Sequence, residues 1–359
     1  MNTLDAAGDL ALVRGGRPLL GSVRVPGDKS LSHRSLMFAA LAEGTSTITG
    51  CSNGDDVVRT GLALAAYGVA IDTVDQTIVV RGGVSRFTEP ERPIDVGNSG
   101  TGFRLLLGIA ARLPFLSVFV GDASIHRRPM DRVTIPLRAM GAQIDGRADG
   151  RLAPIVVRGG GLEGIEYAPP VASAQVKSAI LLAGLGASGT TSVRERPPTR
   201  RHTEELLELV GAPPTVVGDA AEQVVSVRAS VIEPFSIDVP GDPSQAAFLV
   251  VAALIVPGSD LTIEQVYVGP GRAGFIEVLK RMGGAIEVTP RSATTADLHV
   301  RHSSLQATRV AGREVPSLID EIPVLSVAAA FATGRTEFAD AAELRVKESD
   351  RIATTVGEL

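Results

Sequence analysis

The sequence predicts an α/β protein, or α+β in stricter schemes, made of two similar globular domains with three repeated α/β units each. One observation is that Val-Pro-Gly-Asp-Lys-Ser at 25–30 returns as Val-Pro-Gly-Asp-Pro-Ser at 239–244, an offset of 214 residues. The other is a shorter repeat, in which an apolar helical run ends in glycine, a small or β-branched residue follows, and a strand begins. Its glycines are Gly68, Gly141, Gly211 and Gly283. They lie 73, 70 and 72 residues apart, so three units fill one copy.

These repeats place one domain at 22–238 and the other at 1–21 plus 239–359. Each repeated glycine is expected to end a helix in the left-handed conformation, just before a strand. A full second copy would run to about position 453, whereas the chain stops at Leu359. We therefore expect a C-terminally truncated second domain that lacks about 90 residues. A naturally short variant is the alternative.

Composition excludes several functional classes. The 359 residues, 44% hydrophobic and 21% charged, are typical of a soluble globular chain. Cys51 is the single cysteine and no signal-peptide pattern opens the chain, so we expect a reducing compartment, the cytoplasm. The longest apolar run, 246–257, is shorter than the roughly 20 residues that span a bilayer. A net charge of −5, no Trp and 4% aromatics argue against nucleic acid, so small anions are the expected partners.

The segment that opens the first copy predicts an anion site. Lys29, Ser30 and Arg34 follow a glycine turn, where a strand pattern gives way to a helical one. Gly27 is expected to take the backbone angles of a tight turn, and Ser30 to cap a helix that begins with Leu31. The helix N-terminus adds partial positive charge, which suits phosphate or carboxylate. A capped helix with solvated cations is the alternative.

A second glycine-spaced loop, at 95–104, lies between a strand end and a helix start. Asn98 or Ser99 is expected to cap this helix, and Gly100 and Gly102 let a ligand approach the backbone. Glycine-serine turns are common, so this segment alone is a weak signal.

Three further segments supply donors of the same chemical kind. Arg128 and the arginine before it precede a proline, and their planar guanidinium groups suit bidentate binding of phosphate or carboxylate. Ser173, Gln175 and Lys177 offer a hydroxyl, an amide and an ammonium group where another helix begins. The segment 199–204 is expected to be another helix cap with cations beside it. Solvated surface cations are the alternative for each.

The second copy carries the acid–base candidates. Asp320 and Glu321 interrupt an apolar stretch, where partial burial raises a carboxylate's pKa toward the range useful for proton transfer. Helix capping is the alternative for both. Lys347 and Arg351 are four residues apart, so we expect them on one helical face with Glu348 beside them. A surface salt-bridge ladder is the alternative.

Seven of these segments, in this order from about Gly21 to Arg351, resemble the 5-enolpyruvylshikimate-3-phosphate synthases. The matching segments are Pro-Gly-Asp-Lys-Ser-x-Ser-His-Arg (26–34), Gly-Asn-Ser-Gly-Thr (97–101), Arg-Pro-Met (128–130), Ser-Ala-Gln-Val-Lys-Ser-Ala (173–179), Pro-Gly-Asp-Pro-Ser (240–244), Ile-Asp-Glu (319–321) and Arg-Val-Lys-Glu-Ser-Asp-Arg (345–351). The Ser-Ala-Gln-Val-Lys form resembles the bacterial subgroup that contains glyphosate-tolerant members.

This resemblance implies the enolpyruvyl transferase fold, with parallel-sheet faces, outer helices and substrates bound between the domains. It also implies transfer of the enolpyruvyl group of phosphoenolpyruvate to the 5-hydroxyl of shikimate 3-phosphate, with release of phosphate, in aromatic amino-acid biosynthesis. Addition and then elimination pass through a tetrahedral intermediate. The resemblance implies no metal and no organic cofactor, and we expect a monomer that binds these two small molecules and neither nucleic acid nor membrane.

By matching position, the resemblance implies a role for each candidate. Lys29 is expected to contact both substrates and to act in catalysis. Asp320 would accept the 5-hydroxyl proton, and Glu348 would handle the proton at the methylene carbon. Shikimate 3-phosphate is expected at Lys29, Ser30, Arg34, Ser173, Gln175, Arg200, Asp320 and Lys347, and phosphoenolpyruvate at Lys29, Gly100, Arg128, Gln175 and Arg351. Because the two substrates are both anions and repel each other, converging cations are needed to bring them within reacting distance.

Two rival functions stay open. The UDP-N-acetylglucosamine enolpyruvyl transferases share the fold and the phosphoenolpyruvate chemistry, but Lys29, Ser30 and the spacing to Arg34 match the shikimate enzymes, and Cys51 is not in a catalytic-loop setting. The second rival belongs to a different class, in which the chain would be a non-catalytic relic that binds phosphorylated metabolites. Adding back the missing segment would decide between enzyme and relic.

Two expectations concern activity. The family's later Asp-His-Arg segment and a lysine beyond it have no counterpart here, so we expect the 359-residue chain to be inactive by itself. Gly100 leaves space in the phosphoenolpyruvate pocket that an alanine would fill, so we expect glyphosate to inhibit a completed enzyme.

Overall fold

The computed structural model describes residues 16–347 and 349–359. Its contacts divide the chain into two compact units: unit 1, with residues up to Val25 and Gly241–Leu359, and unit 2, with Pro26–Pro240. The expected boundaries, at 22 and 238, lie a few residues earlier. Within the described ranges, no helix has both the length and the apolar character that crossing a membrane requires.

Unit 2 contains three four-stranded sheets with one shared plan. The first runs β13 (Ser236–Asp238), β2 (Gly44–Thr49), β4 (Thr77–Gly82), β3 (Ala70–Val74); the second runs β5 (Ile94–Asp95), β6 (Leu116–Val120), β8 (Leu152–Arg158), β7 (Gln143–Gly146); the third runs β9 (Glu166–Tyr167), β10 (Thr190–Glu195), β12 (Gln223–Arg228), β11 (Thr215–Gly218). In each, the first pair is parallel and the other two pairs are antiparallel.

The expectation of parallel sheets is therefore wrong in detail, because only one of the three strand pairs in each sheet is parallel. A short turn explains the difference in the first sheet: Asp75 and Gln76 join β3 to β4, both with positive φ. A two-residue turn of this kind can connect only antiparallel strands. The mixed α/β class itself is as expected.

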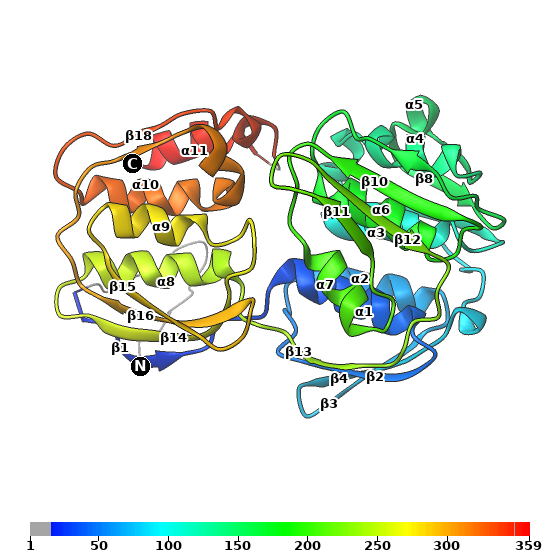
Figure 1. The fold of residues 1–359 in the computed structure, drawn as a ribbon, viewed down its shortest axis with the longest axis horizontal. Coiled ribbons are helices and arrows are strands. Elements are labelled where there is room, and N and C mark those ends of the chain that lie inside the picture. The colour runs from blue at the N-terminus through cyan, green and yellow to red at the C-terminus, as the bar shows by residue number, and fades with distance from the viewer. Residues whose placement is uncertain (1–15, 348) are drawn as a thin grey trace, which may run out of the picture. The chain divides into compact units, whose positions relative to one another are not determined.

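Three helices of unit 2 lie inside it, in the middle of the right-hand unit of Figure 1, whereas the resemblance implied outer helices. They are α1 (Lys29–Leu41), α3 (Gly100–Ala110) and α6 (Ala174–Gly184). Helix α3 buries every residue except Thr101, because its residues are apolar apart from Thr101 and Arg104. The remaining helices of unit 2 are α2 (Asp55–Ala66), α4 (Asp131–Ala139), α5 (Arg147–Gly150), α7 (His202–Leu209) and the short η1 (Val84–Arg86) and η2 (Ile125–Arg127).

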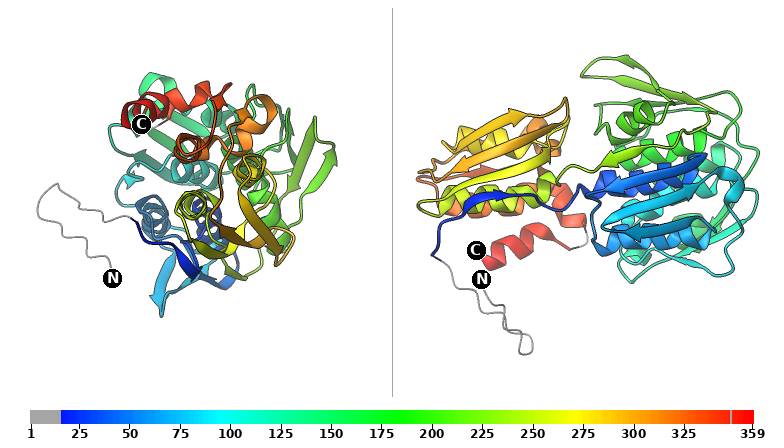
Figure 2. Two further views of the ribbon diagram at one scale, coloured as in Figure 1. Left: turned by 90° about the vertical axis from the view of Figure 1, so that its left-hand side faces the viewer. Right: turned by 90° about the horizontal axis from the view of Figure 1, so that it is seen from below.

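Unit 1 repeats this plan once. Its sheet runs β1 (Leu20–Val23), β14 (Asp260–Tyr267), β16 (Thr295–Arg301), β15 (Ala285–Pro290), and a second parallel pair joins β17 (Arg309–Val310) to β18 (Glu337–Phe338). Figure 2 shows blue β1 beside yellow β14, so the N-terminal strand completes a sheet of the C-terminal half. The helices are α8 (Pro243–Ile255), α9 (Gly274–Arg281), α10 (Ile322–Ala330), α11 (Arg351–Glu358), η3 (Gly312–Ser317), η4 (Ile319–Glu321) and η5 (Ala342–Val346). Val250, Phe275, Leu298 and Leu325 are inaccessible and pack into one core.

The repeated glycines end helices as predicted. Gly68, Gly141, Gly211 and Gly283 have φ of 87°, 106°, 74° and 92°. In each case the next residue's N–H donates to the carbonyl five residues earlier, the closing bond of a Schellman motif. The four bonds are Val69 to Leu64, Ala142 to Leu137, Ala212 to Leu207 and Gly284 to Leu279. The period read from the sequence is therefore a repeated helix end.

Candidate active site

Helix α1 begins earlier than expected. It starts at Lys29, and the carboxylate of Asp28 accepts the N–H of Leu31 at 2.8 Å. Ser30 lies within the first turn, so the expectation that it caps the helix is wrong; a carboxylate satisfies the free N–H and also complements the helix dipole. Gly27 does not have positive φ, but a Cβ there would lie 2.0 Å from a backbone carbonyl oxygen. Its role is therefore close packing rather than an unusual turn.

The two cations of this motif have different surroundings. Lys29 is half exposed, and its ammonium group lies 3.0 Å from an aspartate of α2. Arg34 is only 3% exposed and ties α1 to its neighbours. Its guanidinium donates to the carbonyl of Ser30 and to the hydroxyls of Thr203 and Ser178, at 2.9, 2.9 and 2.7 Å. These bonds use three of its five N–H groups, so Arg34 is held in one position.

Helices α3 and α6 begin as the sequence predicts. Ser99, not Asn98, caps α3 by accepting the N–H of Gly102 at 3.0 Å. Ser173 caps α6 in the same way, at 3.4 Å from the nitrogen of Val176. Helices α1, α3 and α6 thus each carry predicted site residues in the first turn, where N–H groups and the helix dipole favour anions.

Gln175 is oriented by an arginine that sequence analysis missed. Arg104 is 5% exposed and donates to Oε1 of Gln175 at 2.6 Å and to the carbonyl of Pro129 at 3.3 Å. The amide nitrogen of Gln175 then donates to Thr101 at 2.8 Å. Because a guanidinium only donates, it fixes which end of the amide faces it. The available signal was spacing, since Arg104 follows Gly100 by one helical turn.

Gly100 and Arg128 come together from separate segments. A Cβ on Gly100 would lie 2.8 Å from the guanidinium carbon of Arg128 and from both of its terminal nitrogens. The guanidinium therefore occupies the space that the missing side chain leaves at the first residue of α3. This places a cation at a helix N-terminus, where the backbone N–H groups also favour an anion.

In unit 1, two cations gather at Asp320. Its Oδ1 lies 3.2 Å from Nη1 of Arg351 and 3.8 Å from Nζ of Lys347, and its side chain is 27% exposed. The expectation of one helical face is wrong, because Lys347 has extended backbone after η5 while Arg351 begins α11. Helix capping does not explain the acidic pair either, since α10 has no side-chain cap at Glu321. Glu348 lies outside the described residues.

Of three further predicted residues, Lys177 and Thr199 have other roles, whereas Arg200 stays a candidate. Lys177 is 1% exposed and contacts two glutamates, so it does not face a ligand. Thr199 does not cap α7, since its hydroxyl donates to Glu195 instead. Arg200 is half buried in the loop that leads to α7.

His33, which precedes Arg34 in helix α1, is a buried neutral imidazole. Burial, together with the charges of Lys29 and Arg34 and against a smaller opposite effect of Asp28, lowers its pKa to about 3. Its Nδ1 lies 2.8 Å from Oγ1 of Thr60. The ring therefore adds no charge to the site near pH 7.

Comparisons with known proteins agree on one family. Residues 13–359 match the family described as EPSP synthase (3-phosphoshikimate 1-carboxyvinyltransferase). A 3-phosphoshikimate 1-carboxyvinyltransferase of Brevibacillus brevis is 50% identical over 353 residues, 97% of this chain and 82% of the relative. That of Pelotomaculum thermopropionicum is 50% identical over 96% of this chain and 80% of the relative. The structure of EPSP synthase from Acinetobacter baumannii has a TM-score of 0.86 at 43% identity, covering 96% of this chain and 78% of that one.

Proposed function

We propose that this chain, which belongs to the EPSP synthase (3-phosphoshikimate 1-carboxyvinyltransferase) family, transfers the enolpyruvyl group of phosphoenolpyruvate to the 5-hydroxyl of shikimate 3-phosphate and releases phosphate. The observation that carries the proposal is the agreement of family, relatives and fold over nearly the whole chain. We further propose a cytoplasmic monomer of aromatic amino-acid biosynthesis that needs neither a metal nor a nucleic-acid partner.

Unit 2 is proposed to supply most of the anion-binding groups. Shikimate 3-phosphate is assigned to Lys29, Ser30, Arg34, Ser173, Gln175 and Arg200, and phosphoenolpyruvate to Lys29, Gly100, Arg128 and Gln175. Three features support this assignment: helix N-termini, fixed guanidinium groups and a Gln175 amide with one defined orientation. Rigid donors of this kind bind phosphate and carboxylate without reorganising.

Unit 1 is proposed to supply the acid–base groups. Asp320 removes the 5-hydroxyl proton as that oxygen bonds to C2 of phosphoenolpyruvate, and Glu348 delivers a proton to C3. In the elimination step phosphate leaves C2, and the C3 proton departs to restore the double bond. Two contacts support the role of Asp320, because the cations of Lys347 and Arg351 beside it favour the ionised form that a base requires. We assign Lys347 also to shikimate 3-phosphate and Arg351 to phosphoenolpyruvate.

Binding calorimetry with the purified chain tests this function. We expect shikimate 3-phosphate to bind and Lys29→Met to weaken it at least about tenfold, since one charge-assisted contact is lost. Arg81→Met is the matched control, because Arg81 is half exposed like Lys29, pairs with an aspartate, Asp72, and belongs to none of these motifs. Binding of UDP-N-acetylglucosamine in place of shikimate 3-phosphate would favour the rival transferase.

Turnover is measured as phosphate release, with the 359-residue chain and with the C-terminal segment of a relative appended, because the match covers 82% of the Brevibacillus brevis relative. The appended form should produce the enolpyruvyl ether of shikimate 3-phosphate. If neither form binds or converts the substrates, the proposed function is wrong.

A further inference from the structure

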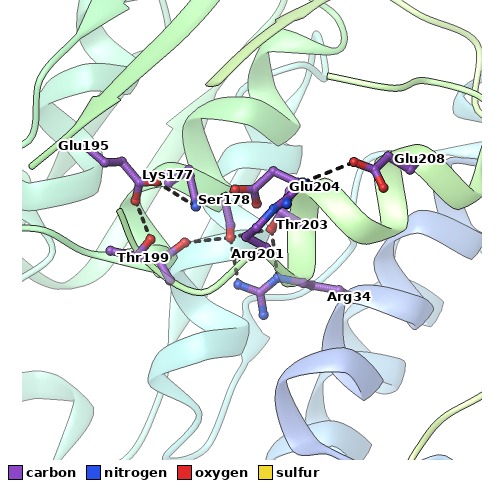
Figure 3. Close-up of polar contacts among 10 residues, drawn as sticks. Arg34, Lys177, Ser178, Glu195, Thr199, Arg201, Thr203, Glu204 and Glu208 are labelled. Carbon is purple, nitrogen blue, oxygen red and sulfur yellow. Dashed lines mark hydrogen bonds and ion pairs between the residues drawn. The ribbon is translucent and has the colours of Figure 1, made fainter. Parts of the chain in front are cut away.

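Unit 2 contains a buried ion cluster that the proposed mechanism does not use. Nζ of Lys177 lies 2.8 Å from Oε2 of Glu195 and 2.6 Å from Oε1 of Glu204. The three side chains are 1%, 2% and 0% exposed, respectively. They come from α6, from the last residue of β10 and from the first turn of α7 (Figure 3). One cation therefore joins three elements at a point closed to solvent.

Stability alone is a poor explanation for this cluster. Removing three charges from water is costly, and well-packed apolar side chains often replace a buried ion pair at no loss of stability. The cluster is also incompletely satisfied, since Oε2 of Glu204 has no hydrogen-bond partner within the described part of the chain. Such groups are better explained by the geometry that they impose.

The first connection from the cluster leads toward Arg200. Lys177 holds Oε2 of Glu195, and the other oxygen of that carboxylate accepts the hydroxyl hydrogen of Thr199. Thr199 immediately precedes Arg200 in the loop between β10 and α7. The loop is thereby tied to α6, the helix that carries Ser173 in its cap.

The second connection leads to Arg34. Glu204, held by Lys177, follows Thr203 in the first turn of α7. The hydroxyl of Thr203 lies 2.6 Å from that of Ser178 on α6, and both hydroxyls accept from Arg34 (Figure 3). Ser178 follows Lys177 on α6, and Thr203 precedes Glu204 on α7. These two residues thus accept the hydrogen bonds that hold the guanidinium of Arg34.

We propose that Lys177 is a positioning residue for shikimate 3-phosphate: through Glu195 and Thr199 it sets the loop that presents Arg200, and through Glu204 it sets the hydroxyl pair that holds Arg34. The inference rests on the proposed function, because it concerns residues assigned to that substrate. Lys177 itself contacts no substrate, since it is closed to solvent.

A pair of variants at Thr199 isolates the first connection while keeping all three buried charges in place. Thr199→Val removes the hydroxyl, and Thr199→Ser keeps it. We expect the valine variant to bind shikimate 3-phosphate about tenfold more weakly, the scale of one lost hydrogen bond to a charged group, and the serine variant to bind as the wild type does. Thr47→Val is the matched control, because Thr47 is also a half-buried threonine whose hydroxyl bonds to a side chain, Ser236. All four proteins should melt within a few degrees of one another.

Lys177→Met tests the origin of the connection. Lys177 and Thr199 both contact the carboxylate of Glu195. The losses of affinity caused by Lys177→Met and by Thr199→Val should therefore not add in the double variant. If Lys177→Met does not fold, the Thr199 pair still decides. Wild-type chain that does not bind shikimate 3-phosphate contradicts the proposed function; wild-type chain that binds it, with equal affinity in Thr199→Val, contradicts this inference alone.

Discussion

The same four residues, Val-Pro-Gly-Asp, precede helices α1 and α8 and end in the aspartate that caps each helix, yet the first turns of the two helices have different surroundings. Asp28 and Asp242 each accept a backbone N–H at 2.8 Å. After the cap, α1 continues with half-exposed Lys29, whereas α8 has Pro243. Position 34 is a buried arginine in α1, and the matching position in α8 is Phe248, 60% exposed. The repeat therefore preserves the backbone of a helix start but not its chemistry.

The start of α8 is closed by its own unit. Arg272 donates to Asp242 at 2.9 Å, and Ser244 donates to Glu321, the neighbour of Asp320. Arg272 also lies 3.9 Å from Glu321, and all three charged side chains are buried. The first turn of α1, with the cation of Lys29, is proposed to bind a substrate, whereas the first turn of α8 fixes the η4 segment. On this proposal, one repeated helix start has a binding role in unit 2 and a supporting role in unit 1.

Removing the cation from the α8 start should have the largest effect. Arg272→Met takes away the positive charge that Asp242 and Glu321 contact in a buried site, which typically costs about 3–5 kcal/mol. Urea denaturation should show this loss in the free energy of unfolding. Arg309→Met, which breaks the exposed pair with Glu337, should cost less than about 1 kcal/mol. Equal small losses would mean that the closed α8 start does not support its unit.

The α1 start carries a buried imidazole that the α8 start lacks, because the residue matching His33 is Ala247. The pKa of His33 falls from an ordinary 6.5 to about 3 on burial. Between these values the unfolded chain binds a proton that the folded chain does not, so stability falls as pH falls through this window. At pH 4 the loss relative to pH 7 is about 3 kcal/mol.

His33→Gln provides the measurement, because the amide can still bond to Thr60 but does not titrate. The free energy of unfolding is followed from pH 7 to pH 4 in both proteins. The variant should lose about 3 kcal/mol less than the wild type over this range. Parallel curves would show that the imidazole titrates normally.

Gly100→Ala tests whether the start of α3, in unit 2, binds phosphoenolpyruvate. A methyl group at this position meets the guanidinium of Arg128 at 2.8 Å, so the flexible side chain must move away. We expect phosphoenolpyruvate, and glyphosate with it, to bind about tenfold more weakly, an effect of about 1.4 kcal/mol. Shikimate 3-phosphate should bind unchanged in calorimetry. An unchanged affinity for phosphoenolpyruvate would mean that Arg128 does not bind this substrate.

Sequence reasoning succeeded where one local rule decides the structure. The repeated glycines and the starts of α3 and α6 follow from backbone geometry, so their positions could be read directly. The same local rule misplaced the cap of α1, where Asp28 has the role expected of Ser30. It failed where contacts come from distant segments. Lys177 looked like a ligand-facing cation, and only the fold shows the two glutamates that enclose it. Arg104 and the meeting of Lys347 and Arg351 at Asp320 were hidden for the same reason.

The smallest effect should be shared by both units. Gly141 in unit 2 and Gly283 in unit 1 end helices at φ of 106° and 92°, and a Cβ would make only ordinary contacts there, at 3.8 and 3.5 Å. Alanine at either position should therefore cost only the strain of a left-handed residue, about 1 kcal/mol. Gly61→Ala, inside α2 with open space around it, should instead gain about 0.5–1 kcal/mol. Because chemical denaturation reports each value separately, unequal losses at Gly141 and Gly283 would mean that the two units do not share one helix-ending device.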